Sequence, residues 1–236
     1  MFLSKCQVCS ADNLDFATRC KSCGSILQDS VKALDLYSTI YNVWRFPDST
    51  LRKIVLATHR NYSLLLAALE GIGLSFFALF IVKAADIYSL QFPLLLGTGL
   101  ALGLVVFLPS IYIFGSVSYA AFRVSRTGAS LKGYISGLVY AMHPIALGTV
   151  ILIPMDVAVF GSYLFSNNPP PQVINPVSFY FLALLDLVSL VAAFVMVRRL
   201  TKVLFGVRLW AIGLAVVFTG IFAAAVEIAK QILLNR

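Results

Sequence analysis

The feature that most constrains this chain is a series of five long apolar stretches separated by short polar segments. A helix needs about 20 apolar residues to cross the hydrocarbon core of a bilayer, and each stretch is long enough. The composition agrees, since only 12% of the residues are charged, whereas soluble domains carry about 25%. We therefore predict an all-α membrane protein whose five spans lie at about residues 62–82, 93–115, 133–155, 177–197 and 209–230.

The distribution of Lys and Arg predicts the orientation of these spans. Short cytoplasmic loops carry an excess of basic residues. The region before residue 61 holds eight of them, the loop after the second span three, and the loop after the fourth span four, against three on the opposite side. We therefore expect a cytoplasmic N-terminus and an external C-terminus. The net charge of +8 follows this topology, and no nucleic-acid partner is expected.

Residues 1–27 carry two Cys-x-x-Cys pairs, and these are the only cysteines in the chain. Four thiolates at this spacing can surround one zinc ion tetrahedrally, which predicts a small zinc ribbon with a structural ion. Gly24 allows the positive φ that such a turn often needs. Two disulfides or an iron–sulfur site are the alternatives, but the compact double turn and a reducing cytoplasm favour zinc. The predicted ligands are Cys6, Cys9, Cys20 and Cys23.

Apolar residues are few in the ribbon, so bound metal must supply most of its folding energy. Leu14, Phe16 and Ile26 are the candidates for a small core or for contacts with a protein partner. We expect the ribbon to act as a docking module for a cytoplasmic or membrane protein.

Residues 28–61 are predicted to form amphipathic juxtamembrane helices. Apolar residues recur at helical spacing from Leu34 to Trp44, and Pro47 can begin a second helix with basic residues on one face. A basic amphipathic helix with Trp and Tyr suits the headgroup interface of a membrane. The alternative is a helix packed on the ribbon.

Four short motifs follow one another in an order that resembles the YIP family, the Rab/Ypt-interacting membrane proteins. They are Leu-Asp-Leu-Tyr at 34–37, Trp-Arg-Phe-Pro at 44–47, Arg-Thr-Gly-Ala-Ser-Leu-Lys-Gly at 126–133 and Tyr-Ala-Met-His-Pro at 140–144. The resemblance covers roughly residues 35–236, with residues 62–236 as the five-span domain and the ribbon as an added module. It implies five spans, a cytoplasmic N-terminus, an adaptor-like role and, for a prokaryotic member, a bacterial inner membrane. Eukaryotic relatives bind small GTPases in vesicle traffic, but no residue here matches a GTPase-binding surface.

Acidic residues in or beside the spans are the second set of candidate functional groups. Asp156, Asp186 and Glu227 are predicted to lie in the outer half, with Lys83 or Lys230 as counter-charge. Such a cluster could bind a cation, a proton or a lipid headgroup. Alternatively, Asp156 bonds backbone groups freed by a proline, and Glu227 pairs with Lys230 at i,i+3.

Two further features within the spans have a functional and a plain interpretation. His143 precedes Pro144 and could serve a proton relay, or it could be a neutral histidine bonded to a carbonyl that the proline frees. Gly99 and Gly103 lie in a glycine-rich stretch that fails the spacing of a dinucleotide loop, so we assign them to close helix packing.

No catalytic motif is present in the sequence, and it holds only two histidines. We therefore expect a non-enzymatic membrane scaffold or adaptor, surrounded by lipid and able to serve as a subunit of a larger membrane complex. The alternative is an ion- or lipid-handling transporter that uses the intramembrane acidic residues.

Overall fold

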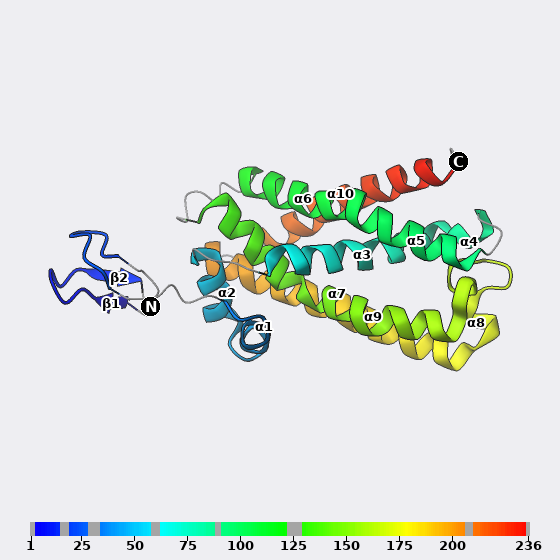
Figure 1. Cartoon of the computed structure of the whole chain (residues 1–236), viewed down its shortest axis with the longest axis horizontal. Helices are drawn as coiled ribbons and strands as arrows, with labels where there is room; N and C mark the ends of the chain where they lie inside the picture. The colour runs from blue at the N-terminus through cyan, green and yellow to red at the C-terminus, as the bar shows by residue number, and fades with distance from the viewer. Residues whose placement is uncertain are drawn as a thin grey trace.

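The computed structural model describes residues 3–14, 19–27, 34–57, 62–87, 91–121, 129–205 and 210–234. A small two-stranded ribbon lies at one end of the molecule, outside a bundle of long helices (Figure 1). In the ribbon, β1 (Leu3–Lys5) pairs antiparallel with β2 (Asp12–Leu14), and the chain between them makes the first Cys-x-x-Cys turn. A bridge between Arg19 and Ile26 closes the second such turn.

Two helices follow the ribbon, in the region predicted to be amphipathic. Helix α1 (Leu36–Arg45) is capped at its N-terminus by Asp35, whose carboxylate accepts a hydrogen bond of 2.8 Å from the N–H of Ser38. Helix α2 (Pro47–Leu56) begins with Pro47. The N–H groups of a first helical turn have no partner within the helix, so the N–H that proline lacks costs no hydrogen bond.

Both helices pack against the bundle, α2 on α7 and α9, and α1 on α2 and α7. Val43 of α1 and Leu51, Ile54 and Val55 of α2 are fully buried there. The sequence pattern indicated the headgroup interface or the ribbon and did not reveal this third packing partner. An uncovered aromatic face remains, formed by Tyr37, Tyr41, Trp44 and Phe46.

Among the described residues, five helices are long and apolar enough to cross a membrane, which confirms the predicted five-span fold. The second span contains a π-helical turn, η1, and the third continues into a 3-10 turn, η3. Short helices α4 (Ala84–Ile87) and α8 (Pro171–Ile174) lie in two of the connections. The spans are α3 (Ser63–Val82), α5–η1–α6 (Phe92–Leu102, Gly103–Phe107, Leu108–Ala121), α7–η3 (Leu131–Phe160, Gly161–Phe165), α9 (Pro176–Phe205) and α10 (Trp210–Leu234).

Helices α7 and α9 are longer than the apolar stretches predicted at 133–155 and 177–197, since each has 30 residues. At about 1.5 Å per residue such a helix exceeds the hydrocarbon core of about 30 Å. Their ends therefore project beyond the apolar layer, where charged residues are tolerated. Pro144 and Pro154 lie inside α7 without ending it.

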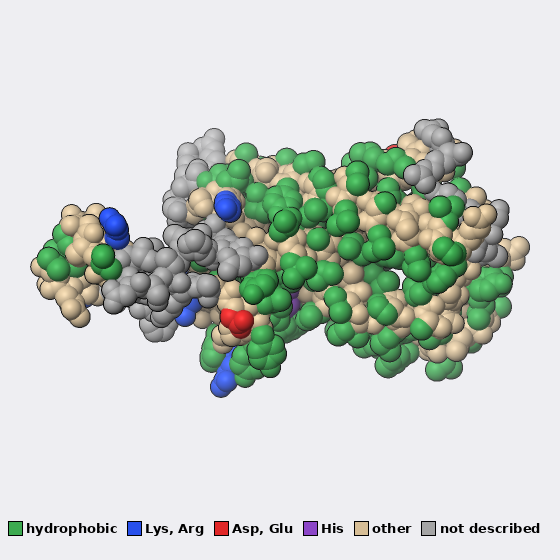
Figure 2. All heavy atoms as spheres, in the orientation of Figure 1, with side chains coloured by type: hydrophobic (Ala, Val, Ile, Leu, Met, Phe, Trp, Pro, Cys, Tyr) green, Lys and Arg blue, Asp and Glu red, His purple; other side chains and the backbone are tan. Residues whose placement is uncertain are grey.

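Contacts at the two ends of the bundle show which connections share a side. Asp48 of α2 lies 3.4 Å from both Arg199 and Lys202 at the end of α9, so the N-terminal region and this end of the fourth span lie together. At the other end, Asp86 accepts hydrogen bonds from the hydroxyl of Ser166 and the N–H of Asn167. Figure 2 shows the visible Lys and Arg side chains on the ribbon and at the end of the bundle nearest to it, and mainly apolar side chains along the rest of the bundle.

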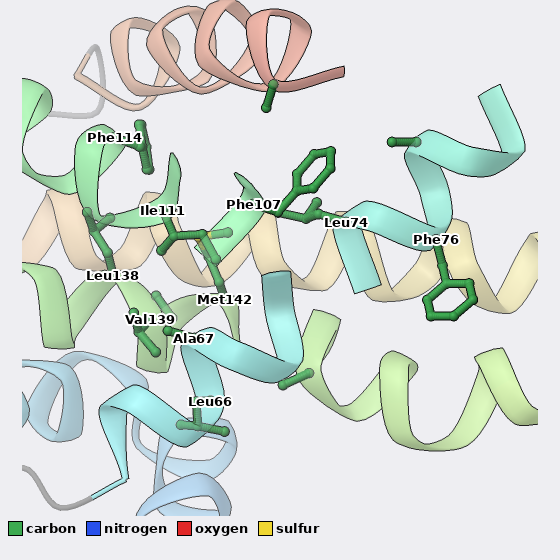
Figure 3. Packing of buried hydrophobic residues seen from close by; sticks show 14 of the residues in the cluster. Leu66, Ala67, Leu74, Phe76, Phe107, Ile111, Phe114, Leu138, Val139 and Met142 are labelled. Carbon is green, nitrogen blue, oxygen red and sulfur yellow. The ribbon is translucent and has the colours of Figure 1, made fainter. Parts of the chain in front are cut away.

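The core of the bundle is centred on α3, which packs on both the second span and α7. Figure 3 shows Leu74 of α3 beside Phe107 of η1, and Ile111 of α6 beside Met142 of α7. The packing of α3 on α7, and of α7 on α9, sets the rotation of α7 and α9 about their own axes. That rotation decides where the polar side chains of these two helices lie.

Candidate functional site

The four cysteine sulfurs gather at one point of the ribbon. All four Sγ atoms lie within 4.8 Å of one another, and none forms a disulfide. The Sγ atoms of Cys6 and Cys23 are 3.6 Å apart, and those of Cys9 and Cys20 are 3.5 Å apart. Tetrahedral bonds of about 2.3 Å place sulfurs about 3.8 Å apart. The donor set therefore fits a single metal ion.

The two Cys-x-x-Cys turns share one hydrogen-bond pattern. In each, the first cysteine donates its N–H to the carbonyl five residues ahead and accepts from the N–H four residues ahead. The residue four ahead has a left-handed backbone, with φ of 55° at Ser10 and 71° at Gly24. The second turn uses glycine for this position, as the sequence predicted, and the first uses serine.

Groups around the sulfurs orient them. The N–H of Val8 lies 3.4 Å from Cys6 Sγ, and the N–H of Ser22 lies 3.4 Å from Cys20 Sγ. The side chain of Asn13 is buried and donates to Cys20 Sγ at 3.4 Å. Asn13 carries no recognisable sequence signal, because its position beside the sulfur depends on the fold of both turns.

These contacts also shift thiol pKa values. Backbone hydrogen bonds from Cys23 and Ser22 lower the pKa of Cys20 to about 6. A backbone hydrogen bond from Ala11 lowers the pKa of Cys9, but its neighbours Cys20 and Cys23 outweigh it and raise that pKa to about 12. Four thiolates this close repel one another, so a bound cation is what allows all four to ionise. With all four as ligands, a tetrahedral ion has no open position for substrate.

The predicted docking residues of the ribbon are only partly described. Ile26 is 67% exposed, and Val8, which is not among the predicted docking residues, is 75% exposed. Phe16 and the side chain of Leu14 lie outside the described residues.

The structure brings together two of the predicted intramembrane polar residues. Asp156 of α7 and Asp186 of α9 both line a cavity of about 370 Å³ between α3, α7 and α9. Glu227, Lys83 and His143 are not among the described residues that line it. Of these five candidate residues, the structure therefore brings two together and places the other three elsewhere.

Those other residues have local partners. Glu227 lies on the exposed side of α10, 3.9 Å from Lys230 and 2.9 Å from the amide of Gln231. The ammonium of Lys83 lies 3.9 Å from the centroid of the Phe80 ring. Burial lowers the pKa of Lys83, although nearby Asp86 opposes this shift. Within the described part of the chain, neither Lys83 nor Lys230 forms an ion pair with Asp156 or Asp186.

His143 is fully buried in α7, and its Nδ1–H donates to the carbonyl of Tyr140 at 2.7 Å. Tyr140 lies four residues before Pro144, which has no N–H, so this is the carbonyl that the proline frees. The imidazole also meets Trp44 of α1 edge to face, with centroids 5.4 Å apart. This geometry supports the plain interpretation of His143, a residue that joins α1 to α7.

Glu70 of α3 is an intramembrane acid outside the predicted cluster. It is fully buried, and neither carboxyl oxygen has a hydrogen-bond partner among the described residues. It belongs to the closely packed side of α3 and does not line the cavity.

Comparison with protein-family models, curated proteins and solved structures finds no match.

Proposed function

We propose that this integral membrane protein is a non-enzymatic scaffold whose zinc ribbon docks a protein partner in the cytoplasm. The gathering of four thiols around one point carries this proposal. Zinc suits four thiolates in tetrahedral geometry, and a filled coordination sphere stabilises the fold without taking part in a reaction. The exposed side chains of Val8 and Ile26 offer an apolar contact surface on the ribbon.

The cytoplasmic location is supported by the shared end of the N-terminal region and α9. Asp48 lies beside Arg199 and Lys202, so two of the basic segments counted in the sequence occupy the same end of the bundle. Basic residues favour the cytoplasmic side, which keeps thiols reduced and able to bind metal. A bacterial inner membrane and membership of the YIP family stay predictions that rest on the sequence motifs alone.

A metal assay tests the ribbon directly. We expect about one zinc per chain in freshly purified protein, because four cysteine ligands complete one tetrahedral site. Cys9→Ser and Cys23→Ser should lose the metal, whereas Ser22→Ala, which keeps all four sulfurs, should retain it. Substoichiometric zinc in the unaltered protein would count against the proposal.

Docking is tested by partner recovery in mild detergent. Proteins that bind the ribbon should be lost with the double substitution Val8→Ser and Ile26→Ser, and also after chelation of the metal. Gln7→Ser, an exposed polar change in the same turn, is the matched control. Recovery that survives both the double substitution and the chelator would exclude the ribbon as the docking module.

A second candidate function is the handling of an ion or a lipid by the bundle. The observation that favours it is the pair Asp156 and Asp186 in one cavity. An aspartate in the apolar layer costs about 2.5–3.5 kcal/mol on insertion scales, so two of them in one place need a reason. If Asp186→Asn purified normally but abolished a flux in reconstituted vesicles, transport would be favoured over a scaffold.

A further inference from the structure

The cavity between α3, α7 and α9 has the dimensions of a ligand site. Its volume of about 370 Å³ lies within the range of about 300–1,000 Å³ typical of small-molecule pockets. Figure 2 shows the molecule hollowed in this region, between the ribbons of α3 and α7 in Figure 1. The side chains of the three helices therefore leave space that a guest molecule can fill.

The wall of the cavity is apolar and aromatic. Phenylalanines from three elements line it, and aliphatic side chains complete it. The ring of Phe80 makes a cation–π contact with Lys83, whose ammonium lies 3.9 Å from the ring centroid. Ring faces of this kind attract ammonium groups. The lining phenylalanines are Phe76, Phe77, Phe80, Phe165 and Phe179.

Asp156 and Asp186 are the charged groups among the described residues of this wall. Asp156 is only 8% exposed, and neither carboxyl group has a hydrogen bond or an ion pair within the described part of the chain. The two side chains line this cavity from different helices, Asp156 from α7 and Asp186 from α9. No described Lys or Arg lines the cavity, so both carboxyl groups are free to pair with a cationic occupant.

The hydroxyl of Thr149, another polar group of the wall, donates to the carbonyls of Leu69 and Ile145 at 3.0 Å each. Small hard cations such as Ca²⁺ take six to eight oxygen ligands, and a wall made mostly of phenyl and aliphatic groups does not supply them. A cation that carries its own apolar surface matches both the wall and the two carboxyl groups.

We propose that this cavity binds an organic cation with an apolar body, its charge facing Asp156 and Asp186. This proposal rests on the second candidate function, the handling of an ion or a lipid by the bundle. It requires that the cavity bind the cation, but it does not require transport across the membrane. The occupant is either a lipid that carries an amine or a soluble hydrophobic cation, because both present the same chemistry.

Two ions of equal size and opposite charge test the proposal on the full chain in detergent. Radiolabelled tetraphenylphosphonium should bind saturably at one site per chain in equilibrium dialysis, and tetraphenylborate should not. Asp156→Asn and Asp186→Asn should each weaken cation binding by about tenfold or more, since one charge-assisted contact is lost. Ala183→Phe, which fills the cavity without a change in charge, should weaken it as well.

Glu227→Gln is the matched control, because this acid lies on α10 away from the cavity, and it should bind the cation normally. Normal elution on size exclusion shows that each variant is folded. Mass spectrometry of co-purified lipid distinguishes the sources. An amine lipid held by the unaltered protein and lost from the Asp156→Asn/Asp186→Asn protein identifies a lipid, whereas cation binding without such a lipid identifies a soluble ligand.

Equal binding of the two probe ions, or cation binding that both aspartate substitutions leave unchanged, would overturn the proposal. Neither result bears on the scaffold, whose tests are zinc content and partner recovery. A flux assay in vesicles separately tests transport, so loss of binding and absence of flux remain distinct outcomes.

Discussion

Gly71 of α3 and Gly103 of η1 lie so close together that neither position has room for a Cβ atom. A Cβ at Gly71 would lie 2.7 Å from the carbonyl oxygen of Gly103, and a Cβ at Gly103 would lie 2.6 Å from Cα of Ile72. Small residues let membrane helices approach to backbone contact, where van der Waals packing is strongest. The first two spans are therefore joined at the turn where the second becomes π-helical.

Gly103→Ala should destabilise the bundle by about 1–3 kcal/mol, the usual range for overpacking a core. The added methyl group meets backbone atoms of α3, which cannot move aside as a flexible side chain can. Denaturant unfolding in mixed micelles measures the change. Gly97→Ala in α5 of the same span is the control, because a Cβ there has no neighbour within 4 Å. Equal effects at the two positions would contradict the close approach.

Ser10→Gly should strengthen the metal site. Ser10 holds φ of 55° in the first turn, at the position that Gly24 fills in the second. A left-handed backbone costs a residue with a side chain about 1–2 kcal/mol, which corresponds to roughly tenfold in metal affinity when binding is coupled to folding. Competition with a chromophoric chelator measures the gain, and Gly24→Ser should give an opposite change. A weaker site in Ser10→Gly would refute this account.

Metal retention should fall as the pH falls. The metal-bound ribbon carries fewer protons than the metal-free ribbon, so added protons favour release. Cys9, with its pKa raised to about 12, already competes for a proton at neutral pH. Cys20, with its pKa lowered to about 6, begins to compete only below that pH, where the dependence should steepen by about one further tenfold step per pH unit. Chelator competition between about pH 5 and 8 tests this, and a flat profile would argue against thiolate ligation.

The packing of α2 on the bundle should depend on the apolar face of the helix and not on its ion pairs. Leu51 is fully buried, so Leu51→Ala should cost about 2–5 kcal/mol, and the resulting loss of packing should expose α1 and α2 to protease. The pairs of Asp48 with Arg199 and Lys202 are about half exposed, so Asp48→Asn should cost about 1 kcal/mol or less, and less still in high salt. Limited proteolysis compares the two variants, and similar cleavage would show that the ion pairs matter more than their exposure indicates.

The candidate metal site could be predicted almost completely because its determinants are close in sequence. Two cysteine pairs ten residues apart can meet through a pair of tight turns, and the structure places their sulfurs within 4.8 Å. The buried Asn13 beside Cys20 was missed, since an isolated asparagine in a polar segment carries no pattern. The hydrogen bond of His143 to a backbone carbonyl could also be predicted from the sequence. The position of Pro144 determines which carbonyl lacks its helical N–H partner, and that carbonyl belongs to Tyr140.

The intramembrane acids were predicted less well. All of them look alike in a hydropathy pattern, and their depth in the bilayer suggested one cluster. The structure separates Glu227, which lies on the exposed side of α10 with Lys230, from Asp156 and Asp186, which share a cavity. The difference comes from the rotation of each helix about its own axis, which depends on contacts with its neighbours.

The sequence by itself determined how many times this chain can cross a membrane and which four sulfurs meet, because stretch length and ligand spacing are properties of continuous segments. Its basic residues also indicated which connections lie on one side, and Asp48 between Arg199 and Lys202 agrees with that arrangement. Only the tertiary structure decided that α1 and α2 pack on the bundle, that Gly71 meets Gly103, and that Asp156 and Asp186 face one hollow. These relationships join residues far apart in the chain, and they arise from side-chain packing between helices, which no single segment encodes.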